Sequence, residues 1–370
     1  KILVARLPSY PAYCRDAARW HDAAVLPHLL DHMDMEGLAR ADDWSPGRIG
    51  AVPAISKAPR RRASGLEAIL ARAAAGERLG EAEIVALLSV RGDQVAAVCA
   101  AADELRRQTV GDCVRYVVNR NINYTNVCYY GCRFCAFSKG RHSAQLRGAP
   151  YDLADEEISR RVAEAWARGA TEVCMQGGIH PEYTGATYLN ILKTAKAAAP
   201  AMHVHAFSPL EVSHGAATLR LPVEVYLARL KEAGLGSLPG TAAEILDDEA
   251  RAVLCPAKLS TAEALAVMEA AHRVGLRSTA TIMFGHIDTS AQWARHLLHI
   301  RNLQARTGGF TEFVPLPFVH MEAPLYLKGR ARSGPTWRET VLMHAVARLA
   351  LHPLIPNIQA SWVKLGHDAV

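Results

Sequence analysis

The sequence has few aromatic residues, no strong excess of one charge and no long apolar run. Aromatic side chains make up 6% of its 370 residues, and the 42 Lys and Arg residues exceed the 36 Asp and Glu residues by only six. Because so mild a basic excess is spread along the chain, it does not favour nucleic-acid binding. No segment approaches the roughly 20 consecutive apolar residues of a membrane span, and the N-terminus lacks a signal-peptide pattern. We therefore predict a cytoplasmic protein that binds neither nucleic acid nor membranes.

Cysteine is also scarce, but its distribution is uneven. Three of the eight cysteines lie within eight residues of one another, and a cytoplasmic location would keep them as thiols or metal ligands. We expect the scattered ones to be small buried apolar residues. These are Cys14, Cys99, Cys113, Cys174 and Cys255.

The first third of the chain divides into three parts by pattern. Residues 1–50 contain aromatic residues and a helix-like stretch at 23–30, and residues 51–63, rich in Pro and Arg, are predicted to form a linker. Residues 64–112 form a helical preamble of three helices, which begin near Ser64, Glu81 and Asp93. Apolar residues in the first recur at the spacing of one helix face.

Residues 113–370 alternate between short β-type runs and helical segments. We predict strands at 114–118, 172–176, 203–207, 236–238, 278–284, 310–315 and 357–360. Helices are predicted at 155–168, 187–199, 222–233, 260–274, 291–306 and 337–351. Such repetition indicates a parallel sheet covered by helices. Seven units in one run favour an α/β barrel of the TIM type, whose active site is built by the loops that follow the strands. The sequence ends just after the seventh predicted strand, so we expect the last strand of the barrel to be missing.

The close cysteines form a Cys-x3-Cys-x2-Cys motif, Cys128, Cys132 and Cys135, after the first predicted strand. Three thiolates can hold three irons of a 4Fe–4S cluster, whereas the usual all-cysteine site uses four. The fourth iron is then free to bind the amino group and carboxylate of S-adenosylmethionine (SAM). The motif predicts one 4Fe–4S cluster that works with SAM.

Two other readings of this motif remain open. A structural zinc site needs a fourth ligand, which His142 could supply, and a ferredoxin-like carrier needs a fourth cysteine.

Phe134, just before the third cysteine, could pack beside an adenine, or it could simply pack within its loop.

The cysteine loop, NRNINYTNVC (119–128), resembles that of radical SAM enzymes, and four later segments resemble a narrower group. The four are CMQGGIHP (174–181), HVHAFSP (203–209), GLGSLPGTAAEIL (234–246) and NIQASWVK (357–364). Together they are similar to the FO synthase family, in its tyrosine-using (CofH-type) half, over about residues 64–366. Residues 1–50 resemble the end of the cyclising (CofG-type) half. The resemblance implies a radical SAM barrel with an N-terminal helical extension, as the C-terminal part of a fused, bifunctional FO synthase.

The resemblance also implies substrates and partners. They are L-tyrosine and 5-amino-6-(D-ribitylamino)uracil, with the CofG-type lyase half and an electron donor as partners. The tyrosine Cα–Cβ bond would break, and the 4-hydroxybenzyl group would join the uracil on the way to a deazaflavin. Two alternatives are an aminofutalosine-type enzyme of menaquinone synthesis and a non-catalytic metal-binding module.

Five residues are candidates for SAM binding. Gly177 and Gly178 match the family's glycine pair near the SAM amino group, although a tight turn after the strand needs the same residues. Ser208 and Glu211 could meet SAM, or they could cap a helix. Phe134 is the fifth. Several histidines and one glutamate near predicted strand ends could contact substrate or be structural. They are His180, His203, His205, His286, His320 and Glu312.

Overall fold

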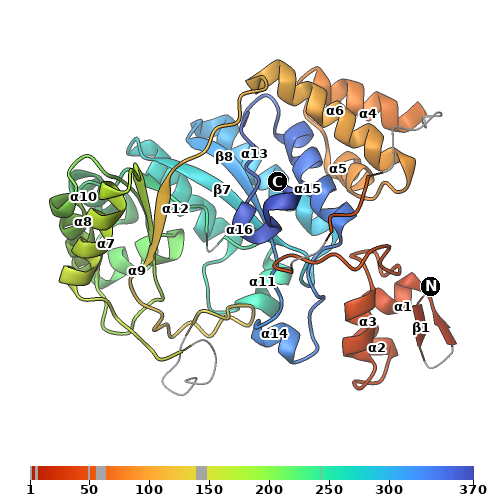
Figure 1. Cartoon of the computed structure of the whole chain (residues 1–370), viewed down its shortest axis with the longest axis horizontal. Helices are drawn as coiled ribbons and strands as arrows, with labels where there is room; N and C mark the ends of the chain where they lie inside the picture. The colour runs from red at the N-terminus through yellow and green to blue at the C-terminus, as the bar shows by residue number, and fades with distance from the viewer. Residues whose placement is uncertain (1, 5–6, 49–50, 56–63, 139–147, 242) are drawn as a thin grey trace.

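Six parallel strands form one curved sheet at the centre of the computed structural model (Figure 1). The structure describes the chain except residues 1, 5–6, 49–50, 56–63, 139–147 and 242. The strands lie side by side in chain order. They are β3 (Asn119–Asn123), β4 (Glu172–Gln176), β5 (His203–Ala206), β6 (Ser237–Leu238), β7 (Arg277–Phe284) and β8 (Phe310–Pro317). The predicted α/β class, a barrel of the TIM type that lacks part of its circle, is confirmed as a half-barrel.

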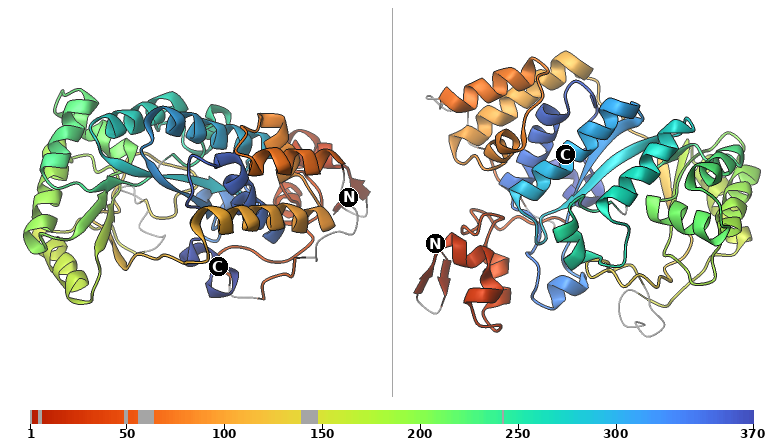
Figure 2. Two further views of the ribbon diagram at one scale, coloured as in Figure 1. Left: turned by 90° about the horizontal axis from the view of Figure 1, so that it is seen from above. Right: turned by 180° about the vertical axis from the view of Figure 1, so that it is seen from behind.

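Helices that follow the strands cover the outer face of the sheet (Figures 1 and 2). They are α7 (Asp155–Ala167), α8 (Gly185–Ala198), α10 (Val223–Glu232), α12 (Thr261–Arg273), α13 (Ser290–Thr307) and α15 (Trp337–Leu351). Alternate strand residues such as Val173 and Val204 are fully buried against them. All six helices lie where the sequence predicts them, because each has an apolar stripe with the helical period.

The first and last predicted strands were wrong. The first strand begins at Asn119 rather than Val114, and Val114 and Tyr116 are 87% and 85% exposed. A strand needs a neighbour, and β4 begins only at Glu172, which pairs with Asn119. The last predicted strand, 357–360, contributes one parallel bridge, between Ile358 and Phe313.

Short helices near the strand ends escaped prediction. They are α9 (Pro209–Thr218), α11 (Asp248–Leu254), α14 (Pro324–Leu327), α16 (Trp362–Leu365) and the single 3-10 turn His367–Ala369. The helices α11, α14 and α16 are too short to show a clear apolar period. α9 has ten residues, and Ser208 and Pro209 form a helix start that the sequence analysis did not use.

The three helices of the preamble form as predicted and pack beside α15. They are α4 (Ser64–Ala74), α5 (Glu81–Leu88) and α6 (Asp93–Val110). None of the described helices can cross a membrane alone; α5 and α6 together have the length and composition but are bent by 119°. The division of the chain at residues 50, 63 and 112 stays a prediction.

The N-terminal residues form a small unit beside the half-barrel (Figure 2). It contains β1 (Ile2–Val4), β2 (Leu7–Ser9), α1 (Pro11–Arg15), α2 (Ala17–Trp20) and α3 (Leu26–His32). The segment after α3 reaches the barrel helices, since the buried Asp34 carboxylate forms ion pairs with Arg91 and Arg338.

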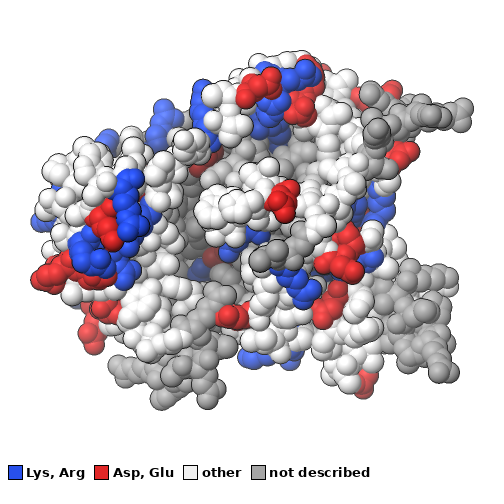
Figure 3. Space-filling view, viewed as in Figure 1, with Lys and Arg blue, Asp and Glu red and all other residues white. Residues whose placement is uncertain are grey.

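Charged side chains of both signs are mixed on the face drawn in Figure 3. On α7, for example, Glu157 pairs with Arg160 and Arg161. Such i,i+3 and i,i+4 pairs are ordinary features of a solvated helix face.

Candidate active site

The loop that carries the three cysteines follows β3 and is fixed firmly at its start. Thr125 and Asn126 are buried, and the Asn126 amide accepts a hydrogen bond from Tyr151 N at 2.8 Å and donates to Ala149 O at 3.2 Å. The Thr125 carbonyl accepts a bond from Gly178 N at 2.9 Å. The loop is thereby tied to the end of β4 before its first cysteine.

Two later elements hold the other end of the loop. Arg133 N donates to Leu254 O at 2.9 Å, at the end of α11, and Arg133 O accepts from Leu325 N at 2.7 Å, in α14. These contacts place Cys132 and Cys135 beside the loops that follow β6 and β8.

The three thiols are half-buried. Burial raises the pKa of Cys132 to about 12, and the Lys258 ammonium opposes this shift. Within the described part of the chain, these thiols do not form a group of ligand atoms within 4.8 Å of each other. A single zinc ion, with Zn–S bonds of about 2.3 Å, would require that closeness. A cluster does not, because each thiolate binds a different iron.

The residues therefore fit an iron–sulfur cluster better than a single zinc ion. His142, the fourth ligand of the zinc alternative, lies outside the described residues.

Gly177 and Gly178 lie where β4 meets the cysteine loop. A Cβ on Gly177 would lie 2.2 Å from the Tyr124 ring, and one on Gly178 would lie 2.2 Å from Val127 O and 2.8 Å from Cys128 Cβ. Both positions therefore need glycine for the close approach of two chain segments. Close packing alone accounts for the pair, and its contact with SAM stays a prediction.

Glu211 is the buried centre of this part of the site. Its carboxylate accepts hydrogen bonds from Gly177 N at 3.0 Å, from Ser208 N at 2.7 Å, and from the Ser208 and Tyr124 hydroxyls. Burial raises the pKa of Glu211, and these hydrogen bonds partly offset that rise. Ser208 and Glu211 form the capping box of α9, so the capping alternative holds, inside the protein rather than on its surface.

Phe134 contacts a different part of the site from the glycine pair. Its ring centroid is 5.2 Å from Nζ of Lys258, and that Nζ donates to Glu244 at 2.8 Å. Burial lowers the pKa of Lys258, but the Glu244 carboxylate and the Cys132 thiol together raise it by more than burial lowers it. The net shift is therefore upward. Among the described contacts, none joins Phe134 to the glycine pair.

The Lys258–Glu244 pair was missed from the sequence. Glu244 lies in a segment that resembles the family, but Lys258 belongs to no motif. Two non-glycine residues with positive φ, Glu244 at 50° and Phe207 at 49°, follow β6 and β5 at this same face. Such backbone strain concentrates at functional sites, and no sequence pattern predicts it for these residue types.

The remaining candidates lie elsewhere. His286 is fully buried, and its Nε2 lies 3.1 Å from Met283 O. Burial lowers the pKa of His320 to about 4, and His180 accepts a bond from Glu182 N. Nδ1 of His320 is buried and has no hydrogen-bond partner among the described residues. Whether any of these three contacts a substrate or is structural stays a prediction. His203, His205 and Glu312 lie at the other end of the strands.

Comparisons with known proteins agree with this architecture. The sequence model of the radical SAM superfamily matches residues 122–300. Methylornithine synthase (PylB) has a similar fold, with a TM-score of 0.54 and 18% identity over 70% of each chain. The FeFe-hydrogenase maturase HydG from Carboxydothermus hydrogenoformans has a TM-score of 0.58 and 15% identity over 80% of this chain and 65% of HydG. At these identities the likeness shows the fold alone.

Curated relatives are far closer in sequence. The 5-amino-6-(D-ribitylamino)uracil–L-tyrosine 4-hydroxyphenyl transferase of Methanopyrus kandleri is 51% identical, over 73% of this chain and 72% of that protein. The chain belongs to the FO synthase and 4-hydroxyphenyl transferase family of radical SAM proteins. FO synthases of Streptomyces coelicolor and Mycobacterium tuberculosis (strain H37Rv) are 44% and 49% identical over 98% of this chain. This chain spans 47% of the length of each, about half of those FO synthases. Members of the radical SAM superfamily use a 4Fe–4S cluster and SAM.

Proposed function

We propose that this chain performs the tyrosine-using reaction of FO synthesis. In that reaction the 4-hydroxybenzyl group of L-tyrosine is transferred to C5 of 5-amino-6-(D-ribitylamino)uracil, with cleavage of the tyrosine Cα–Cβ bond. The observation that carries the proposal is the 51% identity to the Methanopyrus kandleri transferase over nearly three quarters of both chains. A cyclising partner half and an external electron donor belong to the same proposal.

Cys128, Cys132 and Cys135 would hold the cluster, one thiolate to each of three irons. When bound, the cluster supplies the electron that cleaves SAM to a hydrogen-abstracting radical. The protein's own contribution is placement, since the hydrogen bonds of Asn126 and Arg133 fix the two ends of the loop. Radical chemistry depends on such positioning and on the exclusion of water more than on acid–base groups.

Glu211, Ser208 and the glycine pair would form the wall against which SAM binds. The carboxylate holds the Gly177 amide and the start of α9 together, so it fixes the shape of that wall. Phe134, on the other side, offers an apolar ring for the adenine, and Lys258 offers a cation for a carboxylate.

The test is anaerobic reconstitution of the full chain followed by incubation with SAM, a reductant, L-tyrosine and the ribityluracil. We expect one 4Fe–4S cluster per chain, formation of 5′-deoxyadenosine and a 4-hydroxybenzyl adduct of the uracil in mass spectrometry. Cys132→Ala should abolish all three, whereas Cys113→Ala, an exposed cysteine outside the loop, should leave them unchanged. Turnover of a futalosine precursor in place of tyrosine and the uracil would refute the proposal.

A further inference from the structure

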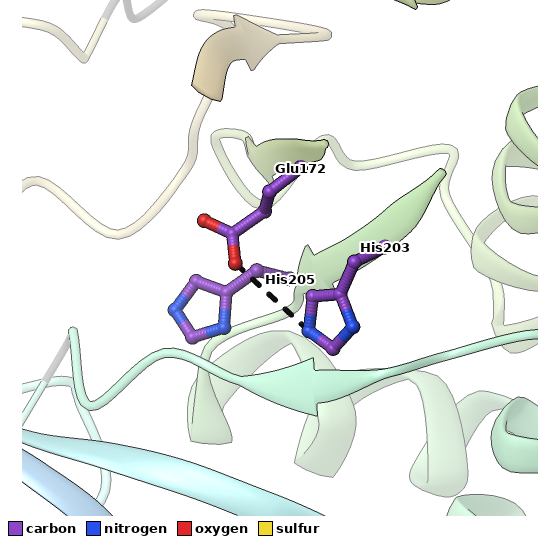
Figure 4. A group of neighbouring side chains, drawn as sticks. All are labelled: Glu172, His203 and His205. Carbon is purple, nitrogen blue, oxygen red and sulfur yellow. Dashed lines mark ion pairs between the residues drawn. The ribbon is translucent and has the colours of Figure 1, made fainter. Parts of the chain in front are cut away.

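Three side chains with metal-binding atoms meet on the inner face of the half-barrel, at the amino ends of its strands (Figure 4). Glu172 begins β4, and the parallel register places it opposite His203, the first residue of β5. His205 follows two residues later, so it extends from the same face of the strand. The intervening Val204 is buried against the helices, and both histidines therefore face away from the helical layer.

The distances within this group suit a single ion. Each residue offers one ligand atom, and the three atoms lie within 4.8 Å of one another. Oε2 of Glu172 is 3.9 Å from Nε2 of His203. Imidazole nitrogens and carboxylate oxygens bind zinc at about 2.0–2.2 Å, so a small closure would bring all three into range. Over the described part of the chain, this is the one set of three that meets the criterion.

The charges around the group also favour a cation. A second carboxylate, that of Glu312 on β8, is close enough for its charge to interact with that of Glu172. Within the described residues neither carboxylate forms an ion pair with Lys or Arg.

Neighbouring polar groups contact the ligands, and a metal on Nε2 of His203 would replace the contact of that atom with Ser237. Oγ of Ser237 lies 2.7 Å from Nε2 of His203 and 2.7 Å from Nδ1 of His205, and Asn119 donates to Glu172 at 3.3 Å. One hydroxyl can donate to only one of the two rings and must accept from the other. The alternative to a metal is this hydrogen-bonded chain by itself, and the experiment below separates the two.

We propose that Glu172, His203 and His205 bind a divalent transition-metal ion, with Zn²⁺ as the best match. Three protein ligands leave a fourth position for water or for a polar group of a bound molecule. The site is separate from the cysteine loop and goes beyond the proposed transferase reaction, which does not require it.

The direct test uses the cluster-loaded full chain, in which iron occupies the cysteines. After incubation with Zn²⁺ and desalting, elemental analysis should find one zinc per chain in addition to the iron. His205→Ala and Glu172→Gln should each weaken zinc binding at least tenfold, while His28→Ala, an exposed histidine on α3, should leave it unchanged. Equal zinc binding in the first two variants and the unaltered protein would overturn the proposal.

A second measurement removes the cysteines altogether. In the Cys128→Ala, Cys132→Ala, Cys135→Ala variant, Co²⁺ should give the visible absorption of a nitrogen–oxygen site at one equivalent, without thiolate charge-transfer bands. Less than half an equivalent would contradict the proposal. Circular dichroism shows whether each variant is folded. If His205→Ala is unfolded, Glu172→Gln decides, since it keeps the size and the hydrogen bonding of the side chain. No step depends on transferase activity, so failure here leaves the proposed function standing.

Discussion

At the scale of single residues, the site depends on close contacts that tolerate little change. Gly177 and Gly178 let β4 approach the cysteine loop, and Glu211 binds four donors with one carboxylate. Buried groups with such exact partners are expensive to alter, because every lost partner leaves a polar atom without water or protein.

Gly178→Ala should destabilise the protein by about 1–3 kcal/mol, because its Cβ would meet Val127 O and Cys128 at overlapping distances. The fraction of chains that bind a cluster should fall as well. Gly65→Ala is the matched control, since a Cβ there meets nothing within 4 Å. Urea unfolding measures the free energy of unfolding of each variant, and equal values for the two would contradict the packing explanation.

Lys258→Met should lower the reduction potential of the cluster by an amount on the order of tens of millivolts. The reason is that the ammonium, close to Cys132, favours the more negative reduced state. A redox titration followed by electron paramagnetic resonance measures the potential. Lys231→Met, on α10, is the control, because that lysine bonds to Val274 O away from the site. An unchanged potential in Lys258→Met would show that the Lys258 ammonium does not act on the cluster.

At the scale of elements, the residues that cap the N-termini of helices also bind other parts of the chain. Five of the helices around the sheet begin with a capping box formed by side chains at the N-cap and N3 positions. That of α15 is buried. Its Glu339 accepts from Thr336 N at 2.8 Å, from Met35 N at 2.6 Å and from Arg332 at 3.0 Å. One carboxylate thus ties α15 to the segment that follows α3.

Glu339→Gln should therefore destabilise the protein by about 3–5 kcal/mol at pH 7, as expected when a buried ion pair loses one partner. Glu263→Gln makes the same change in the exposed capping box of α12 and should cost about 1 kcal/mol. Thermal or urea unfolding of both variants provides the comparison. Similar losses would mean that the contacts of Glu339 to Arg332 and Met35 contribute nothing.

The difference between Glu339→Gln and the unaltered protein should also depend on pH. Burial raises the pKa of Glu339, but Arg332 and the backbone N–H groups of Met35 and Thr336 lower it below the ordinary carboxyl value. A carboxyl group with a lowered pKa in the folded state stabilises the fold above its unfolded pKa, and this contribution is lost as the pH falls through the folded pKa. The difference should thus be full at pH 7 and shrink in acid.

At the scale of the whole molecule, the half-barrel has two core clusters that meet at its shortest strand. One lies around β3 to β6 and the other around β7 and β8. β6 has only two residues and one register pair with β5. Inner-face groups on either side, such as Glu172 and Glu312, therefore come together only through the curvature of the sheet.

Hydrogen exchange across the full chain tests this arrangement. Amides of residues 114–118 should exchange close to the rate of an unfolded chain, since Val114 and Tyr116 are exposed and have no strand beside them. Amides of β4 and β7 should exchange slowest, because each is paired with a strand on both sides. Mass spectrometry of peptides measures the exchange rates of both groups of amides. Slow exchange at 114–118 would support the strand predicted there.

Most helices and strands could be predicted because their signals are local. Apolar residues with the helical period predict α7, α12 and α15, and short β-type runs between helical segments predict β4 and β7. The same reasoning failed at 114–118, where a β-type run has no partner, and at Asn119–Asn123, where a polar run forms a strand because β4 lies beside it.

The candidate site divides in the same way. Cys128, Cys132 and Cys135 were found from their spacing, and the family from short segments after the strands, because both are properties of neighbouring residues. The pairs Lys258–Glu244, Glu339–Met35 and Glu172–His203 join residues distant in sequence. Only the tertiary structure decided them, since strand register and loop closure bring such residues together and no local pattern records that contact.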